Sequence, residues 1–102
     1  MCGVVGYLKC VGSRNNANGS ANIGADAQKS ALTTIKNRGL DAEGEWHDRH
    51  IWLGHRRLSI VDTHHRGNQP MNYNQYVISF NGMIYNFREI RQTLIQKGYK
   101  FR

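Results

Sequence analysis

The sequence is poor in several features that mark specialised classes of protein. It has one proline and 11 glycines among 102 residues, which excludes collagen-like and proline-rich disordered chains. Its apolar runs are only a few residues long, too short for a membrane-spanning helix, and the first residues lack a basic region followed by an apolar stretch, so we expect no signal peptide. Two cysteines, Cys2 and Cys10, are too few for a disulfide framework. We therefore expect one small globular domain, located in the cytoplasm.

Acidic residues are also scarce, with 7 Asp and Glu against 14 Lys and Arg, giving a net charge of +7. Such a surplus suits an anionic partner such as nucleic acid. The basic residues are nevertheless scattered, with no run of five, so neither nucleic acid nor a membrane is the expected partner. No set of Cys and His residues has the spacing of a metal site, so we expect no metal in this segment.

The distribution of apolar and turn-forming residues predicts an α+β chain. Runs rich in β-branched and aromatic residues indicate strands, at residues 3–8, 44–47, 51–55 and 76–80. The first is expected to be buried, and the second and third to form an antiparallel pair around a turn at 48–50. The turn dipeptide Asn81-Gly82 is expected to end the last strand, and the polar stretch 63–74 to be a loop.

Two further segments have the spacing of amphipathic helices, residues 25–38 and 86–97. Gly39 is expected to stop the first helix. The second begins with a capping-box arrangement, in which Asn86 is the N-cap and Glu89 follows three residues later. Gly98 is expected to close this helix. Its apolar stripe consists of Phe87, Ile90, Leu94 and Ile95.

Cys2 has an unusual chemical option. Aminopeptidases remove an initiator Met that precedes a small side chain, and Cys2 would then carry both a thiol and a free α-amine. An α-amine titrates near ~7.7–8.0, so it can act as a general base at neutral pH for the nucleophile beside it. An incidental Cys after Met1 is the alternative interpretation.

A nucleophile that attacks a carbonyl also needs donors for the oxyanion and a means of holding the substrate. Asn81 could offer its side-chain amide and Gly82 its backbone N–H. A substrate carboxylate calls for a fixed arginine, whose planar fork binds both oxygens. Arg56 and Arg57 follow a predicted strand, and one of them should point inward.

Five ordered motifs then indicate a family. They are M-C-G-V-V-G-Y at the start, R-G-L-D-A-E-G at 38–44, G-H-R-R-L-S-I-V-D at 54–62, G-N-Q-P-M at 67–71 and F-N-G-M-I-Y-N-F-R-E-I-R at 80–91. Together they resemble the N-terminal glutaminase domain of glutamine-hydrolysing asparagine synthetases. These domains are class II glutamine amidotransferases of the N-terminal-nucleophile hydrolase group.

The resemblance implies a role for each candidate residue. Cys2 would attack the glutamine side-chain amide, while Asn81 and Gly82 would stabilise the oxyanion. Arg57 would hold the α-carboxylate of L-glutamine. By the same resemblance, backbone groups of Leu58 and Ile60 would line the substrate pocket. The active-site wall would consist of Arg38, Gly39 and Asp41. Met83 stands where the family has a Glu that contacts the substrate α-amine.

The resemblance also implies the architecture and the partners. The expected fold is part of a four-layer αββα sandwich with antiparallel sheets, and residues 1–102 would be the N-terminal part of the glutaminase domain. No cofactor is expected in this segment, whereas ATP and Mg²⁺ would belong to a synthetase domain that transfers the ammonia to aspartate. Exposed apolar faces would favour homo-oligomers or binding to the remaining half-domain or a synthetase subunit. The alternative function is a catalytically impaired remnant that acts as a binding partner.

Overall fold

The computed structural model describes residues 1–9, 24–60 and 63–101. Helices and antiparallel strands alternate along the chain, which confirms the predicted α+β class. The strands are β1 (Gly3–Leu8), β2 (Ala42–His47), β3 (Ile51–Arg57), β4 (Met71–Tyr73) and β5 (Tyr76–Ile78). The α-helices are α1 (Ala25–Thr34) and α2 (Phe87–Gln96), and short 3₁₀ turns occupy Lys36–Arg38 and His65–Gly67. Cys10 lies outside the described residues.

β3 is the central strand of the larger sheet, whose order is β1-β3-β2 with antiparallel neighbours. The turn between β2 and β3 lies where the sequence predicts it. There the carboxylate of Asp48 accepts the backbone N–H groups of His50 and Ile51, at 2.6 and 2.7 Å. These two bonds lower the pKa of Asp48 below its ordinary value, because they favour the ionised form. The predicted hairpin is therefore confirmed, and both strands extend beyond the predicted ranges.

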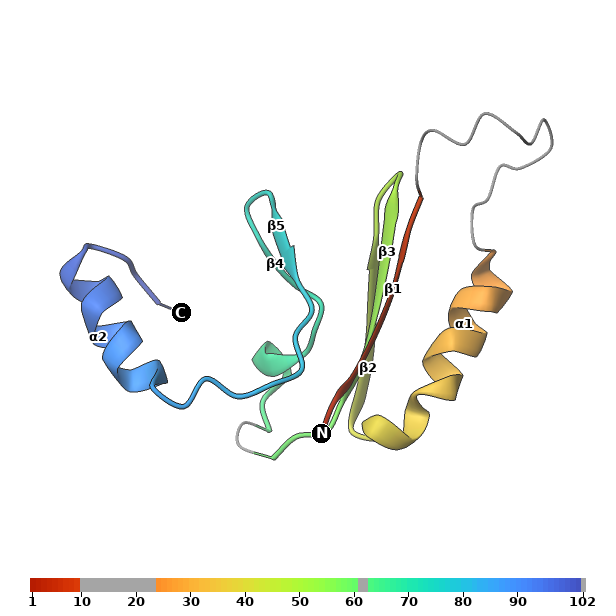
Figure 1. Ribbon diagram of the computed structural model, residues 1–102, viewed down its shortest axis with the longest axis horizontal. Coiled ribbons are helices and arrows are strands. Elements are labelled where there is room, and N and C mark those ends of the chain that lie inside the picture. The colour runs from red at the N-terminus through yellow and green to blue at the C-terminus, as the bar shows by residue number, and fades with distance from the viewer. Residues whose placement is uncertain (10–23, 61–62, 102) are drawn as a thin grey trace.

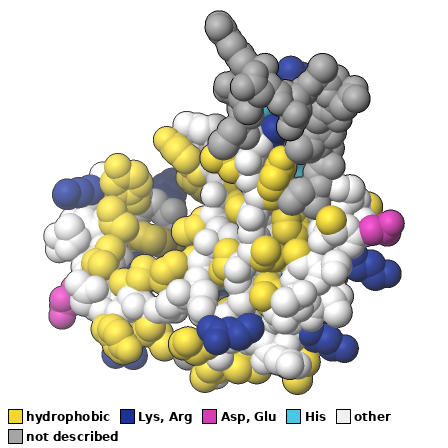
Figure 2. All heavy atoms as spheres, turned by 45° about the vertical axis from the view of Figure 1, so that its right-hand side comes forward, with side chains coloured by type: hydrophobic (Ala, Val, Ile, Leu, Met, Phe, Trp, Pro, Cys, Tyr) yellow, Lys and Arg dark blue, Asp and Glu magenta, His cyan; other side chains and the backbone are white. Residues whose placement is uncertain are grey.

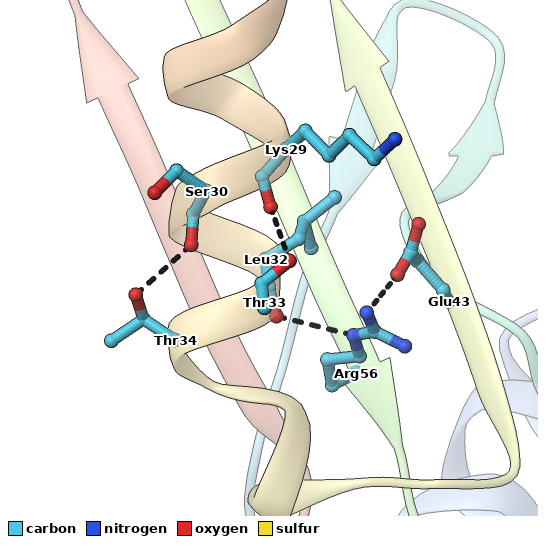
Figure 3. Close-up of polar contacts among 7 residues, drawn as sticks. All are labelled: Lys29, Ser30, Leu32, Thr33, Thr34, Glu43 and Arg56. Atoms are coloured by element: carbon cyan, nitrogen blue, oxygen red, sulfur yellow. Dashed lines mark hydrogen bonds and ion pairs between the residues drawn. The ribbon is translucent and has the colours of Figure 1, made fainter.

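Side chains of β3 alternate between the two faces of the sheet. Trp52 points toward α1, and its side chain lies with that of Leu32 over Gly54. A Cβ added to Gly54 would lie 2.8 Å from the Leu32 side chain and 2.8 Å from the Trp52 side chain. Leu32 and Trp52 are the buried large hydrophobic residues of the described chain. Arg56 lies on the same face: its Nε donates to the carbonyl of Leu32 at 3.2 Å, and its guanidinium pairs with Glu43 (Figure 3).

The first predicted helix is α-helical over a shorter range than expected, and its last turn is a 3₁₀ turn. α1 gives way to a 3₁₀ turn after Thr34, and Gly39 is extended, with φ −164°. A Cβ on Gly39 would lie 2.5 Å from the carbonyl carbon of Arg57. Gly39 is the C-cap of this 3₁₀ turn, with its N–H donating to the carbonyl of Lys36 at 3.1 Å, so it stops the helical segment at the predicted position while also making close backbone contact with β3.

Two predictions about strands also need correction. The polar stretch 63–74 contains strand β4, which pairs with β5 through a turn at Asn74, whose φ is 52°. β5 ends at Ile78, so Asn81-Gly82 follows two further residues and closes no hairpin. β1 was expected to be buried, yet Val4 and Leu8 are exposed, because β1 is an edge strand.

α2 matches its predicted range within one residue at each end. The Asn86 side chain makes no capping hydrogen bond, so the predicted capping box does not form. The C-terminus closes as predicted at Gly98, whose φ is +88°. The N–H groups of Gly98 and Tyr99 donate to the carbonyls of Ile95 and Leu94, the pattern of a Schellman motif.

Four layers follow one another along the long axis of the molecule: α1, the three-stranded sheet, the β4–β5 hairpin and α2 (Figure 1). This order is consistent with a partial αββα sandwich. The accessible surface is 8801 Å², against roughly 5,900 Å² for a compact protein of this mass. Hydrophobic side chains accordingly spread over the face shown in Figure 2. Within the described ranges, no helix is long and apolar enough to cross a membrane.

Candidate active site

Cys2 lies at the end of the sheet where β1 begins and β3 ends. Gly3 pairs with Arg56 in the β1–β3 register, so Cys2 comes next to the chain that leaves β3. The sulfur of Cys2 accepts the backbone N–H of Leu58 at 3.4 Å, and it lies 3.8 Å from the Leu58 carbonyl oxygen. The thiol is half-buried, whereas Met1 before it is 70% exposed. Backbone contacts therefore fix the sulfur while the N-terminus stays accessible.

Arg57 is the last residue of β3 and one of the few buried charged side chains, 8% exposed. It lies on the opposite face of the sheet from Arg56. Its Nη1 donates to the carbonyl of His64 at 2.8 Å and to Oδ1 of Asn68 at 2.9 Å. These bonds hold the guanidinium in one direction, as expected for a side chain that recognises a carboxylate.

The predicted wall residues surround the same end of the sheet. A Cβ on Gly3 would lie 2.9 Å from Cβ of Arg38, so Arg38 packs beside the start of β1. Gly39 contacts the backbone at the end of β3. The backbone N–H of Asp41 donates to the carbonyl of Arg57 at 3.0 Å, and its carboxylate accepts the N–H of Ser59 at 2.5 Å.

A cavity of about 280 Å³ opens beside Arg57. Its walls come from the end of β3 and from the segments on either side, namely Asp41, Ala42, Arg57, Ser59, Thr63, His65 and Asn68. The volume is close to the lower end of the range for small-molecule sites, roughly 300 Å³. A second cavity of about 330 Å³ lies at the opposite end of the sheet, around the Asp48–His50 turn, and none of the candidate residues line it.

The remaining candidates lie on exposed backbone. Leu58 is 36% exposed and Ile60 73% exposed on the segment that leaves β3. Asn81, Gly82 and Met83 lie on the exposed segment between β5 and α2. Within the described chain, no hydrogen bond joins Asn81 or Gly82 to Cys2.

His55, to which the sequence assigned no candidate role, connects that segment to the sheet. It is 1% exposed, and its Nε2 lies 3.3 Å from the carbonyl oxygen of Phe80, the residue before Asn81. Gln69, also missed, accepts the backbone N–H of Phe80 at 2.5 Å. The period-two pattern of β3 already places His55 on the face of Arg57, which is the signal that identifies it.

Burial is the main cause that lowers the pKa of His55, and the charge of Arg57 lowers it further, while the bond to Phe80 acts in the opposite direction. His55 is therefore neutral at pH 7. In the ranges 1–9, 24–60 and 63–101, no group of three or more His, Cys, Asp or Glu residues lies close enough together to hold a metal ion.

Comparison with known proteins gives the family. The model of the family described as "Glutamine amidotransferase domain" matches residues 1–102. The chain is 41% identical over 103 residues to asparagine synthetase [glutamine-hydrolyzing] 1 of Bacillus subtilis, an alignment that covers 99% of this chain and 15% of the relative. It is 34% identical to amidase chry2 of Gibberella zeae, covering 99% of this chain and 16% of that protein.

A shorter match concerns the glutamine–fructose-6-phosphate aminotransferase [isomerizing] of Saccharomyces cerevisiae. The two sequences are 44% identical over 50 residues, which cover 49% of this chain and 7% of the yeast protein. The chain thus spans only about one sixth of the length of the relatives that it matches over nearly its whole extent. No solved structure matches the chain.

Proposed function

The chain belongs to the glutamine amidotransferase domain family, and on that premise we propose that it hydrolyses the side-chain amide of L-glutamine to release ammonia. The observation that carries this proposal is the position of Cys2. Its sulfur is held by Leu58, the residue that follows the buried, hydrogen-bonded Arg57. The proposed nucleophile and the proposed carboxylate-binding cation thereby lie at one end of the same sheet, and Arg57 and Ser59, the residues on either side of Leu58, line the cavity there.

The reaction starts from a chain that has lost Met1, whose exposure supports access by an aminopeptidase. The α-amine of Cys2 takes the thiol proton as the sulfur attacks the amide carbon of glutamine. The same amine then gives the proton to the departing nitrogen, so that ammonia leaves and a glutamyl thioester remains. Water hydrolyses the thioester, which yields glutamate and regenerates the thiol.

The other candidates serve this chemistry by binding and orientation. Arg57 holds the α-carboxylate, and backbone groups of Leu58 and Ile60 line the pocket. Asn81 and the N–H of Gly82 stabilise the oxyanion of the tetrahedral intermediate. Arg38, Gly39 and Asp41 form the wall, and Asp41 supports it by fixing the backbone at Ser59.

The destination of the ammonia follows from the relatives named asparagine synthetase. By that similarity we propose aspartate as the acceptor, activated with ATP and Mg²⁺ in a synthetase region. The 102 residues would contribute the glutaminase part of that enzyme.

The test is covalent labelling of untagged protein with a diazoketone analogue of L-glutamine, followed by intact mass and peptide mass analysis. We expect loss of Met1, one label on Cys2, no label on Cys10, and protection by L-glutamine but not by L-asparagine. Cys2→Ser is the matched control and should take no label. Equal labelling of both cysteines, or label that L-glutamine does not compete, would refute the proposal.

A second function rests on a separate observation. Phe87, Ile90 and Ile95 of α2 are between 41% and 54% exposed, so an apolar helix face is open to a partner. Met83 also lacks the carboxylate that the family places at this position. A non-enzymatic chain that binds a synthetase subunit would co-purify with that subunit and would leave Cys2 unlabelled.

A further inference from the structure

His55 is the most completely buried large side chain of the described residues, and the proposed chemistry gives it no task. It lies on the central strand β3, two residues before Arg57 and on the same face. Within the described chain its Nε2 contacts the carbonyl oxygen of Phe80, while its Nδ1 is buried without a hydrogen-bond partner. Burying an unpaired polar atom is destabilising, so a hydrophobic residue would pack there at lower cost.

The tautomer follows from the contact. A carbonyl oxygen only accepts hydrogen bonds, so Nε2 must carry the proton and donate it to Phe80. The lowered pKa of His55 keeps the ring neutral, which is compatible with an unpartnered Nδ1.

Phe80 is held through both of its backbone polar groups. His55 donates to its carbonyl, and the side chain of Gln69 accepts its N–H at 2.5 Å. Gln69 is itself seated against β2, because a Cβ on Gly44 would overlap the carbonyl oxygen of Gln69. Gly44 pairs with His55 in the sheet, so the two groups that hold Phe80 are anchored at neighbouring positions.

The ring of Phe80 also contacts Gly82. A Cβ on Gly82 would lie 2.6 Å from Cζ of Phe80, so the aromatic ring packs on the glycine α-carbon. The backbone and the side chain of Phe80 therefore both restrict the position of Asn81-Gly82, the dipeptide proposed to bind the oxyanion.

We propose that His55 is a positioning residue for the oxyanion site: together with Gln69 it fixes Phe80 and thereby the donors of Asn81 and Gly82. This inference rests on the proposed glutaminase function. An error of about 1 Å in the position of a catalytic group can cost roughly 100-fold in rate, so one remote hydrogen bond can control turnover.

The test compares His55→Leu, His55→Gln and wild type by glutamine hydrolysis and by alkylation of Cys2 with iodoacetamide. Alkylation is a displacement at a saturated carbon and forms no oxyanion, so it reports the nucleophile alone. We expect His55→Leu to lower kcat about 10-fold to 100-fold, with KM and the alkylation rate changed less than about threefold. His55→Gln retains an N–H donor and should recover most of kcat.

Gln69→Met provides an independent variant if His55→Leu does not fold, and it should lower kcat with the same small change in KM. Gln75→Met, in the exposed β4–β5 turn, is its matched control and should behave as wild type. An active wild type with unchanged kcat in His55→Leu and Gln69→Met overturns this inference alone. Parallel losses of kcat and of alkylation rate also overturn it, because they indicate a purely structural role. A wild type without glutamine hydrolysis overturns both proposals.

Discussion

The guanidinium of Arg57 lies directly against the α-carbon of Gly67, so that any Cβ at position 67 would overlap it. Hydrogen bonds to His64 and Asn68 set the direction of the same group. The segment that follows β3 therefore both leaves room for the Arg57 guanidinium, at Gly67, and sets its orientation, through His64 and Asn68.

Gly67→Ala should displace the Arg57 guanidinium, which is the flexible end of its side chain, and leave the backbone in place. We expect KM for L-glutamine to rise about tenfold, since hydrogen bonds to charged groups contribute about 1.5–3 kcal/mol. The melting temperature should change little. Steady-state kinetics and thermal denaturation measure the two effects, and Gly24→Ala, with nothing within 4 Å, is the control. An unchanged KM would show that Arg57 does not bind the substrate.

Whereas Gly67→Ala should change KM and leave stability nearly constant, Gly39→Ala should lower the stability of the folded protein. Its Cβ would meet the backbone of Arg56 and Arg57 at 2.5–2.7 Å, and a paired central strand cannot move as a side chain can. We expect a loss of about 1–3 kcal/mol of stability, read from the urea midpoint at constant m-value. Gly24→Ala again serves as the reference. A midpoint within error of wild type would contradict the close approach described at this position.

Met83→Glu should strengthen glutamine binding by restoring a carboxylate for the substrate α-amine. Because Met83 is 59% exposed, solvent screens the new ion pair. We therefore expect a decrease in KM of about threefold to tenfold, with kcat nearly constant. Met83→Gln, which has similar size and no charge, should leave KM close to the wild-type value. Equal KM values for the Glu and Gln variants would refute the charge-based explanation.

Asp48 should make the β2–β3 turn sensitive to acid. Its pKa in the folded chain is lowered by the two backbone N–H bonds, so the unfolded chain binds the proton more readily. Its stabilisation is fully present above the ordinary value of 3.8 and is lost as pH falls through the folded pKa. Asp48→Ala should therefore melt below wild type at pH 7, and the difference should shrink as pH falls toward 2. Asp48→Asn keeps an acceptor oxygen at every pH, so the melting temperature should depend less on acid. A gap between wild type and Asp48→Ala that persists at pH 2 would be inconsistent with this assignment.

The exposed stripe of α2 should promote self-association. Ile90 is 41% exposed and Ile95 is 47% exposed, which favours burial of this face against another molecule. Ile90→Lys should shift the protein toward monomer in sedimentation velocity without lowering its melting temperature. Gln92→Lys adds the same charge to an exposed position of the helix outside the stripe and should leave the association state unchanged. Equal effects of the two lysines would assign the association to charge instead of apolar contact.

Local patterns predicted most of the secondary structure. Apolar periodicity located α2, and the turn chemistry of Asp48 and Gly98 located the ends of elements. The stop at Gly39 was predicted correctly, but its close contact with the backbone of β3 was not, because a glycine after a helical pattern signals a cap and does not reveal a distant neighbour. β4 was missed because its three residues, Met71–Tyr73, form a strand through their pairing with β5, and a sequence of that length is too short to show a period of its own.

Cys2 and Arg57 could be named as candidates from the sequence because one motif carries both their position and their chemistry, and the catalytic and binding roles assigned to them stay predictions. His55 and Gln69 escaped because their importance depends on Phe80, which lies 25 and 11 residues further along the chain. Such pairings appear only when the β4–β5 segment returns to the face of β3. Spacing within a single motif contains no information about them.

The alternation of β3 also has an evolutionary consequence. The side of the strand that faces α1 carries Trp52, Gly54 and Arg56. The opposite side carries His55 and Arg57. A deletion or insertion of one codon within this strand would move the residues on one side of the change to the opposite face, which would either send the cation into the helix contact or turn the indole away from α1. Descendants of this sequence can therefore change the length of the β2–β3 turn far more easily than the number of residues between Trp52 and Arg57.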